Sequence, residues 1–320
     1  MLPIIGNFRA HGKLLLSGEY AVLDGALSLA LPTRKGQELR LYAHTAPDRH
    51  LHWQSYDEQG NCWLDAMFDA AAATLLFPAA NPEATALQGL LQAALRLNPH
   101  FGQEMVGIVA QTTLQFPRIW GLGSSSTLVS LVAQWAGVNP YALLENSFGG
   151  SGYDIACATA RTPILYQRAT NYNSDTQPNP YVQPIAFAPP FADRLYFVHL
   201  GHKQNSRQAI DHYRQINPDL RRSIVADISD ISRQLGQCSR LSDFEQLLRQ
   251  HEQILSQCLQ LPTAQSRYFA DYNGTVKSLG AWGGDFVLAT AAPANNIDQT
   301  RQYFAQRGFS TLLPYAEMIL

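Results

Sequence analysis

Glycine and hydroxyl-bearing residues are concentrated in one short segment of the chain, Gly121–Thr127. Its glycines, Gly121 and Gly123, can adopt positive φ and let backbone N–H groups approach an anion closely. The following residues, 126–135, carry apolar side chains at a helical spacing, so the segment lies where a loop opens a helix. A helix N-terminus attracts negative charge. The segment therefore predicts a phosphate-binding loop, although glycine and serine also cap ordinary helices.

The motifs of other nucleotide-binding folds are absent from the sequence. There is no Gly-x-x-x-x-Gly-Lys-Ser/Thr run and no Gly-x-Gly-x-x-Gly followed by an acidic residue, which disfavours the P-loop and Rossmann classes. The nine histidines show no His-Glu-x-x-His spacing, and the four cysteines form no Cys-x-x-Cys pair. These patterns disfavour zinc catalysis and a cysteine-based metal site.

The composition is that of an ordinary globular protein, with 46% hydrophobic and 15% charged residues. Because 320 residues exceed what one hydrophobic core usually supports, we expect two domains. The net charge of −2 offers no basic surface for nucleic acid or an anionic membrane. No signal-peptide pattern and no apolar stretch of about 20 residues occurs. We therefore expect a cytoplasmic protein with small-molecule partners, whose oligomeric state is open, a homodimer being one alternative.

The periodicity of the apolar residues predicts a mixture of strands and helices. Strands are expected at residues 39–44, 51–55, 105–114, 195–200 and 286–290, and helices at 64–76, 84–97, 126–135, 224–235, 244–255 and 297–307. Asparagine and proline gather in Asn171–Pro190, as is typical of a linker. We place the domain boundary in this segment, with residues 1–175 and 176–320 as the two domains.

Three separated segments resemble, in the same order, the three motifs of the GHMP kinase superfamily. Gly12-Lys-Leu-Leu-Leu-Ser-Gly-Glu-Tyr-Ala-Val-Leu resembles motif one, and Pro117-Arg-Ile-Trp-Gly-Leu-Gly-Ser-Ser-Ser resembles motif two, the ATP-binding motif. Gly280-Ala-Trp-Gly-Gly-Asp resembles motif three but departs from its run of glycines at Trp282 and Asp285. These two side chains put the phosphate contacts of motif three in doubt.

A further segment, Gly152-Tyr-Asp-Ile-Ala, matches the name of a bacterial subgroup, the GYDIA family of GHMP kinases. The resemblance as a whole extends from residue 12 to residue 290. It implies a two-domain α+β GHMP kinase fold, with a ribosomal protein S5 domain 2-like N-terminal domain and a ferredoxin-like C-terminal domain.

The resemblance also implies the cofactors ATP and Mg²⁺. The phosphates of ATP are expected on the loop of motif two, that is, on Gly121, Leu122, Gly123, Ser124, Ser125 and Ser126. Ser125 corresponds to a serine that binds Mg²⁺, which prefers oxygen ligands. Glu145 is the nearest candidate for a second magnesium ligand, and a solvent-exposed helix residue is the alternative role for it.

Two catalytic residues are implied in the same way. Asp154 aligns with the aspartate beside the acceptor hydroxyl, where a carboxylate could accept a proton or orient the hydroxyl. The alternative is an Asx-turn or a helix cap. Lys13 matches the lysine of motif one, whose charge would stabilise a developing alkoxide and keep Asp154 ionised. The alternative for Lys13 is a solvated position at a strand start.

The expected substrate-binding residues come from four segments of the chain. Lys203 lies in a polar turn whose cations would suit an acidic or phosphorylated substrate, and a charged surface turn without a substrate is the alternative. Glu19 either lies beside the substrate or makes a structural hydrogen bond, and we favour the structural hydrogen bond. The full set is Glu19, Tyr20, Ser151, Gly152, Lys203, Ser206, Gly283 and Gly284.

The function implied is an ATP-dependent kinase that phosphorylates a small acid of the mevalonate pathway of isoprenoid biosynthesis. Phosphomevalonate is the first choice of acceptor and mevalonate the second, because Gly-Glu-Tyr-Ala-Val in motif one resembles phosphomevalonate kinase more closely. One alternative is a non-catalytic protein of this fold that binds a nucleotide or metabolite, which the altered motif three favours. Another is an enzyme like diphosphomevalonate decarboxylase.

Overall fold

The computed structural model describes residues 3–44, 49–77, 81–169, 179–201, 206–280, 282, 284–291 and 297–320, with the backbone alone at 206–209. By their contacts the residues form two compact units. Unit 1 comprises Met1–Gly12, Lys35–Arg118 and Leu122–Thr159, and unit 2 comprises Lys13–Arg34, Ile119–Gly121 and Ala160–Leu320. The long strands β1 (Ile4–Ser17) and β2 (Ser28–Ala43) contribute residues to both units.

The sheet of unit 1 is mostly antiparallel, with one parallel pair. Residues 37–43 of β2 pair with β6 (Ile108–Leu114), and β6 runs parallel to β3 (His50–Tyr56). Strand β3 pairs in turn with β4 (Cys62–Asp69), which carries the short β5 (Thr74–Leu75) at its edge. Buried and partly exposed residues alternate along β3, which indicates one core face and one wetter face.

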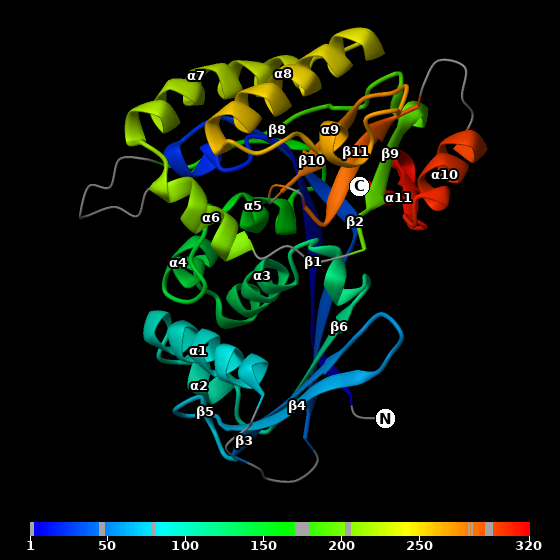
Figure 1. Cartoon of the computed structure of the whole chain (residues 1–320). Helices are drawn as coiled ribbons and strands as arrows, with labels where there is room; N and C mark the ends of the chain where they lie inside the picture. The colour runs from blue at the N-terminus through cyan, green and yellow to red at the C-terminus, as the bar shows by residue number, and fades with distance from the viewer. Residues whose placement is uncertain are drawn as a thin grey trace. The chain divides into compact units, whose positions relative to one another are not determined.

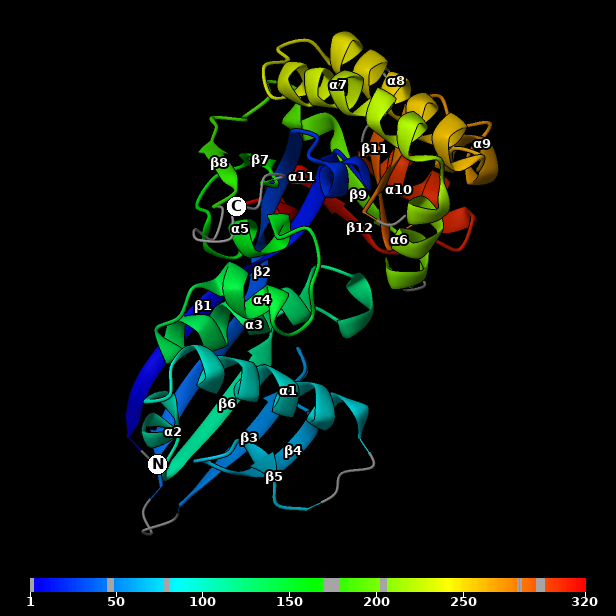
Figure 2. The same ribbon diagram turned by 90° about the vertical axis from the view of Figure 1, so that its left-hand side faces the viewer.

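Helices cover the core face of this sheet, as Figures 1 and 2 show for α1 (Pro82–Leu97) and α3 (Ser124–Ala136). The remaining helices of unit 1 are α2 (Phe101–Glu104), α4 (Pro140–Glu145) and α5 (Tyr153–Thr159). Trp135 of α3 lies 6.4 Å from Trp53 of β3 and 4.9 Å from Phe101, measured between ring centroids. Aromatic pairs of this kind add specific geometry to the burial of apolar area.

The helix predicted at residues 64–76 is wrong. The segment forms β4, a turn and β5, and β4 pairs antiparallel with β3 from His50↔Asp69 to Tyr56↔Cys62. Its alanine and leucine residues suit a helix locally, but the neighbouring strand supplies backbone partners and buries alternate side chains. Helix and strand predictions elsewhere are confirmed, among them α1, α3, β11 (Phe286–Thr290) and α10 (Ile297–Gln306).

Unit 2 contains two groups of strands. Residues 28–30 of β2 pair with β7 (Ile164–Gln167), which pairs with β8 (Tyr181–Pro184), a strand that formed within the predicted linker. The second sheet is fully antiparallel, with the order β10-β11-β9-β12, where β9 is Leu195–His199, β10 is Val276–Leu279 and β12 is Leu312–Pro314. The succession β9, helices, β10, β11, α10, β12 in this order is the ferredoxin-like arrangement, which confirms that prediction.

Two long helices, α7 (Pro218–Leu235) and α8 (Leu241–Leu259), pack side by side in unit 2 (Figure 1). Besides α10, unit 2 contains the helical segments η1 (Ala21–Asp24), η3 (Ala192–Arg194), α6 (Ser206–Gln215), α9 (Ala264–Tyr268) and α11 (Tyr315–Met318). Apolar side chains of α7 and α8 enclose Tyr20 and Ala21 in a shared cluster. Motif one is therefore part of the core of unit 2.

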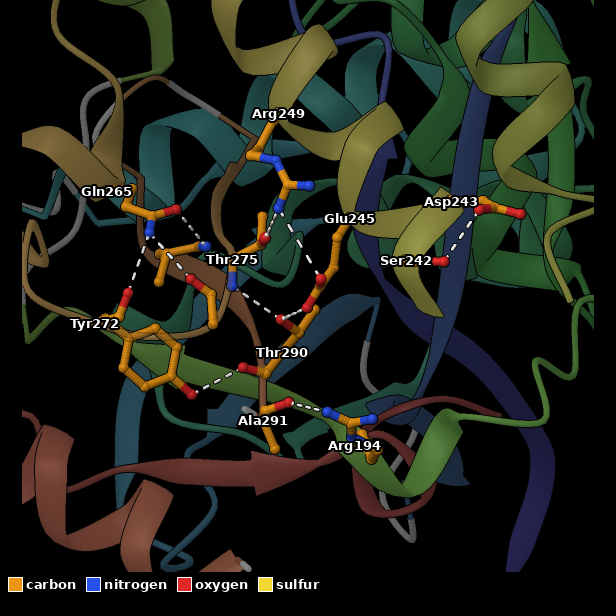
Figure 3. A network of polar contacts seen from close by, with 12 residues as sticks. Arg194, Ser242, Asp243, Glu245, Arg249, Gln265, Tyr272, Thr275, Thr290 and Ala291 are labelled. Atoms are coloured by element: carbon orange, nitrogen blue, oxygen red, sulfur yellow. Dashed lines mark hydrogen bonds and ion pairs between the residues drawn. The ribbon is translucent and has the colours of Figure 1, made fainter. Parts of the chain in front are cut away.

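A polar network joins α8 to the second sheet (Figure 3). The hydroxyl of Thr290 donates to Glu245 at 2.5 Å and accepts from the backbone N–H of Thr275 at 2.9 Å. Arg249 donates to the Thr275 hydroxyl, and Gln265 bridges the backbone of Gly274 and Val276. Because Thr290 and Thr275 are buried, their polar groups need partners within the protein.

The predicted division into residues 1–175 and 176–320 stays a prediction, since its boundary lies outside the described residues. The two compact units differ from the predicted domains because each of the strands β1 and β2 has residues in both units. No helix among the described residues is long and apolar enough to cross a bilayer.

Thr290→Val should lower the free energy of unfolding by about 1–3 kcal/mol, because the substitution leaves a buried N–H and a carboxylate oxygen without a partner. Urea denaturation measures the change. The matched control is Ser242→Ala, which removes an exposed hydrogen bond to Asp243 (Figure 3) and should cost less than about 0.5 kcal/mol. Equal effects of the two variants would contradict the role given to Thr290.

Candidate active site

The predicted phosphate loop has the backbone that its glycines suggested. Gly121 and Gly123 have φ of 64° and 91°, and Gly123 is the N-cap of α3. The Ser126 hydroxyl donates to the Gly123 carbonyl at 2.9 Å, and Thr127 is buried, with its hydroxyl 2.7 Å from Gln37 Oε1. The two hydroxyls at 126 and 127 therefore stabilise the helix start. Ser125 is exposed.

Residues of motif one and motif three both contact Gly121. The ammonium of Lys13 donates to the Gly121 carbonyl oxygen at 3.0 Å. From motif three, Asp285 lies so close that a Cβ at position 121 would stand 1.6 Å from its Oδ2. Lys13 thus fixes the carbonyl that opens the loop, and the Asp285 side chain occupies the space that a Cβ at position 121 would need.

Asp154 lies in the first turn of the short helix α5, and its Oδ1 accepts from the backbone N–H of Ile155 at 3.0 Å. Helix α5 packs against α3, the helix that begins at the phosphate loop. The charge of Asp154 also acts on Tyr141 of α4. The pKa of Tyr141 is raised to about 12, first by burial and then by the nearby Cys157 and Asp154. The hydrogen bond from the Ile155 N–H agrees with the helix-cap alternative for Asp154. The packing of α5 on α3 is compatible with a role of Asp154 near the loop.

Glu19 is buried in an ionic cluster. It is 1% exposed, and the ammonium of Lys277, on β10, donates to its Oε1 at 2.5 Å and to the Ser278 carbonyl at 2.7 Å. His251 of α8 lies beside them, with its Nε2 accepting from the Gly18 N–H at 2.9 Å. Such burial leaves Glu19 little surface with which to contact a substrate.

The protonation states in this cluster follow from burial. Burial, and next the charge of Lys277, lowers the pKa of His251 well below its usual value, so the ring is neutral. Its Nε2 lies 3.2 Å from Glu19 Oε2, but a lone pair that already accepts from Gly18 makes no ion pair there. Burial raises the pKa of Glu19 against the opposing charge of Lys277, and raises that of Glu252 to about 7.

Tyr20 joins motif one to motif three. Its hydroxyl accepts from the Trp282 backbone N–H at 2.5 Å, and its ring stacks on Tyr213 with centroids 5.4 Å apart. Burial raises the pKa of Tyr20 to about 12. The indole N–H of Trp282 donates to the Pro262 carbonyl at 2.9 Å. Trp282 is therefore held by both of its N–H groups, which explains a bulky residue where the motif usually has glycine.

The remaining predicted residues are distributed as follows. Glu145 is the exposed last residue of α4, Gly152 precedes α5 with φ of 86°, and Gly284 is buried next to Asp285. Leu122 is buried and Ser124 begins α3, while Ser151 is partly exposed. Lys203 and Gly283 lie outside the described residues, as does the side chain of Ser206, the first residue of α6.

Lys277 and His251 escaped the sequence predictions. The available signals were a lysine inside a short strand that begins with Val276 and ends with Leu279, and a histidine on the face of α8 that also carries Leu248 and Leu255. A polar residue on an apolar face is typical of a buried hydrogen-bond partner. The contacts of His251 with Gly18 and of Lys277 with Glu19 each join residues more than 230 positions apart in the sequence.

The donor set fits a magnesium ion bound together with phosphates. No group of three or more His, Cys, Asp or Glu side chains that could hold a metal occurs in the part of the chain that the structure describes. Mg²⁺ does not require such a group, since it keeps waters and takes one or two protein ligands plus phosphate oxygens. The exposed Ser125 hydroxyl at the start of α3 can serve as one of these ligands.

Solved structures of similar fold cover nearly the whole chain. The L. major mevalonate kinase in complex with R-mevalonate is 17% identical, with 98% of this chain and 97% of that chain covered and a TM-score of 0.63. The Streptococcus pneumoniae phosphomevalonate kinase in complex with phosphomevalonate and AMPPNP is also 17% identical, with coverages of 97% and 99% and a TM-score of 0.70. The chain has the GHMP kinase fold.

A third similar structure extends the comparison to a sugar kinase. The Lactococcus lactis galactokinase complexed with galactose is 13% identical, with 96% of this chain and 92% of that chain covered and a TM-score of 0.67. No protein-family model and no curated protein sequence matches the chain. The GHMP kinase fold is therefore common to this chain and to kinases of quite different acceptors, so fold alone does not select the acceptor.

Gly121→Ala should destabilise the protein more than Gly137→Ala, as urea denaturation would measure. Both glycines flank α3 with nearly the same φ, 64° and 62°, so both variants carry a backbone cost of about 1–2 kcal/mol. A Cβ at 137 meets nothing within 4 Å, whereas one at 121 collides with Asp285. Adding Asp285→Ala to Gly121→Ala should recover much of the stability that Gly121→Ala loses beyond the loss in Gly137→Ala. Equal costs for the two single variants would refute this contact.

Glu252→Gln should change how stability depends on pH. A pKa raised from 4.5 to about 7 means that the folded state holds the proton more tightly than the unfolded state does. This stabilisation is complete below the unfolded pKa and is lost as pH rises through 7. The stability of the variant relative to the wild type should therefore increase from pH 5 to pH 8, by on the order of 2 kcal/mol.

Urea denaturation at both pH values measures this difference. The exposed Glu317→Gln, also in unit 2, controls for the removal of one carboxylate. If the free energies of unfolding of the wild type and Glu252→Gln differ by the same amount at every pH, the result contradicts a proton held at Glu252.

Proposed function

We propose that this protein is an ATP-dependent GHMP kinase that transfers the γ-phosphate of ATP to a small acid of the mevalonate pathway. Phosphomevalonate is the first candidate acceptor and mevalonate the second. The observation that carries the proposal is the loop at Gly121–Ser126, with both glycines at positive φ immediately before α3 and with Lys13 on the Gly121 carbonyl. In a GHMP kinase fold, such a loop supports phosphate binding by backbone N–H groups at a helix start.

In this proposal, the residues of motif two bind the phosphates of ATP. The backbone N–H groups of residues 121–126 lie at the positive end of α3, where phosphate oxygens can accept from them. Ser125, with Glu145 as the second candidate, would hold Mg²⁺. The ion would neutralise charge on the transferred phosphoryl group.

Asp154 and Lys13 are assigned to the acceptor. With mevalonate the attacking atom is a hydroxyl oxygen, and the Asp154 carboxylate would orient it and take its proton. With phosphomevalonate the attacking oxygen belongs to a phosphate that is largely ionised at neutral pH, so Asp154 would act by orientation. The ammonium of Lys13 would stabilise negative charge on the acceptor. Tyr20, Ser151, Gly152, Lys203, Ser206, Gly283 and Gly284 are proposed to contact the substrate.

A second candidate function is the binding of a nucleotide or metabolite without catalysis. The observation that favours it is the Asp285 carboxylate against Gly121, which adds a negative charge where the phosphate loop begins. A carboxylate at this position opposes phosphate binding unless a cation compensates it. A decarboxylase related to these kinases would release carbon dioxide along with ADP, which separates it from a kinase.

The deciding experiment measures ADP release by the purified protein with ATP and Mg²⁺, using mevalonate, phosphomevalonate, homoserine and simple sugars as separate acceptors. Release that depends on one acceptor, without carbon dioxide, would support the kinase and identify its substrate class. Absence of release with every acceptor, while ATP still binds, would favour the binding role.

Asp154→Asn should reduce kcat by about 10²–10⁴-fold with a hydroxyl acceptor, because the amide cannot accept the proton. ATP affinity should stay within a few-fold of the wild type, as measured by equilibrium binding. The exposed Glu104→Gln is the control for the loss of a carboxylate in the same unit. A wild-type kcat in Asp154→Asn would remove this residue from its proposed role.

A further inference from the structure

A small cavity in unit 2 is lined by three arginines. Its volume is about 310 Å³, and it lies where η1, the end of β7 and the first turn of α7 meet. Arg168, Arg221 and Arg222 line it together with Leu23, Asp24, Ala169 and Pro218. None of these residues has a role in the proposed kinase reaction.

Arg221 is held rigidly at the wall of this cavity. Its Nη1 lies 2.9 Å from each carboxylate oxygen of Asp24, and its Nε donates to the Ile216 carbonyl at 3.2 Å. Asp24 is itself fixed by the Tyr213 hydroxyl at 2.7 Å. The side chain of Arg221 is only 17% exposed, so this guanidinium is positioned before any ligand arrives.

Arg221 keeps donors available for a ligand. A guanidinium has five N–H groups. The Nη1 nitrogen faces both carboxylate oxygens of Asp24 and the Nε–H faces Ile216, while no partner of Nη2 occurs among the described residues. The Nη2 nitrogen of this fixed arginine can therefore donate charge-assisted hydrogen bonds to the oxygens of a phosphate or carboxylate.

The other charges around the cavity also favour an anion. Asp24 is the one carboxylate in the described lining, against three guanidinium groups. Arg222 pairs with Asp219 at 2.5 Å, but both side chains are largely exposed, so this pair holds Arg222 weakly. The first turn of the 18-residue helix α7 adds its positive dipole end to the same wall.

The geometry points to a binding site for a phosphate dianion in this cavity. Arg221 Nη2 donates to the phosphate oxygens, and Arg168 and Arg222 neutralise its second charge. The volume lies at the lower end of the range of about 300–1,000 Å³ for ligand sites, so the ligand is inorganic phosphate or a small phosphate monoester. The site is independent of ATP binding and of catalysis.

The test is calorimetric titration of the full-length protein with inorganic phosphate, in a low-salt buffer without ATP. The double variant Arg168→Ala/Arg222→Ala should weaken binding at this site by about tenfold or more, because two charge-assisted contacts are lost. These positions are preferred to Arg221, whose removal would leave Asp24 without its cation.

The matched control is Arg233→Ala, which lies on the same helix and also breaks an Arg–Asp pair at i,i+3 spacing. It should bind phosphate as the wild type does. Absence of phosphate binding by the wild type, unchanged affinity in the double variant, or an equal loss in Arg233→Ala would each overturn the site. None of these readouts depends on the protein being a kinase.

A parallel titration with glycerol 3-phosphate distinguishes the two sources of the phosphate group. Tighter binding of the ester than of inorganic phosphate, lost in the double variant, assigns the site to phosphorylated metabolites. The reverse order, again lost in the double variant, assigns it to the free ion. Either order supports the phosphate site.

Discussion

The buried ion pair between Glu19 and Lys277 is the interaction on which unit 2 depends. Moving two charges into a protein interior costs several kcal/mol per ion, and the cost is recovered only with good geometry and further hydrogen bonds. Here the ammonium reaches both the carboxylate and the Ser278 carbonyl, and neither side chain is more than 1% exposed. The chain can satisfy these groups in few other arrangements, so the pair fixes motif one against β10.

Consecutive residues of motif one extend this constraint. Gly18 donates to His251 of α8, Glu19 accepts from Lys277 of β10, and Tyr20 accepts from the backbone of Trp282. A short segment thus contacts a helix, a strand and motif three, each through a different residue. These attachments hold a segment from the start of the chain within a core built mainly from its second half.

Gly121 is where the three motifs meet chemically. Its carbonyl accepts from Lys13, and its α-carbon lies against Asp285. A phosphate loop next to a carboxylate is electrostatically frustrated, and Lys13 is the cation that the structure places on the same residue. The altered motif three therefore changes the charge at the loop and fills space with the indole of Trp282, whose two N–H groups are both bonded.

Local features were readable from the amino-acid order. The glycine loop before α3, the α1 and α7 helices and strand β11 follow from spacings within one element, because helix and strand periods act on neighbouring residues. The helix prediction at 64–76 is wrong because alanine and leucine favour a helix locally. The segment forms strands instead, since β3 supplies backbone hydrogen-bond partners that local propensity does not include.

Tertiary structure alone decided the partners of Glu19, the contact of Asp285 with Gly121 and the three-arginine cavity. Each joins residues that lie far apart in the sequence, and the register of the sheets and the packing of α7 and α8 bring them together. Single residue types give no hint of such pairs, since a buried charge is stable only beside a partner whose position the whole fold determines.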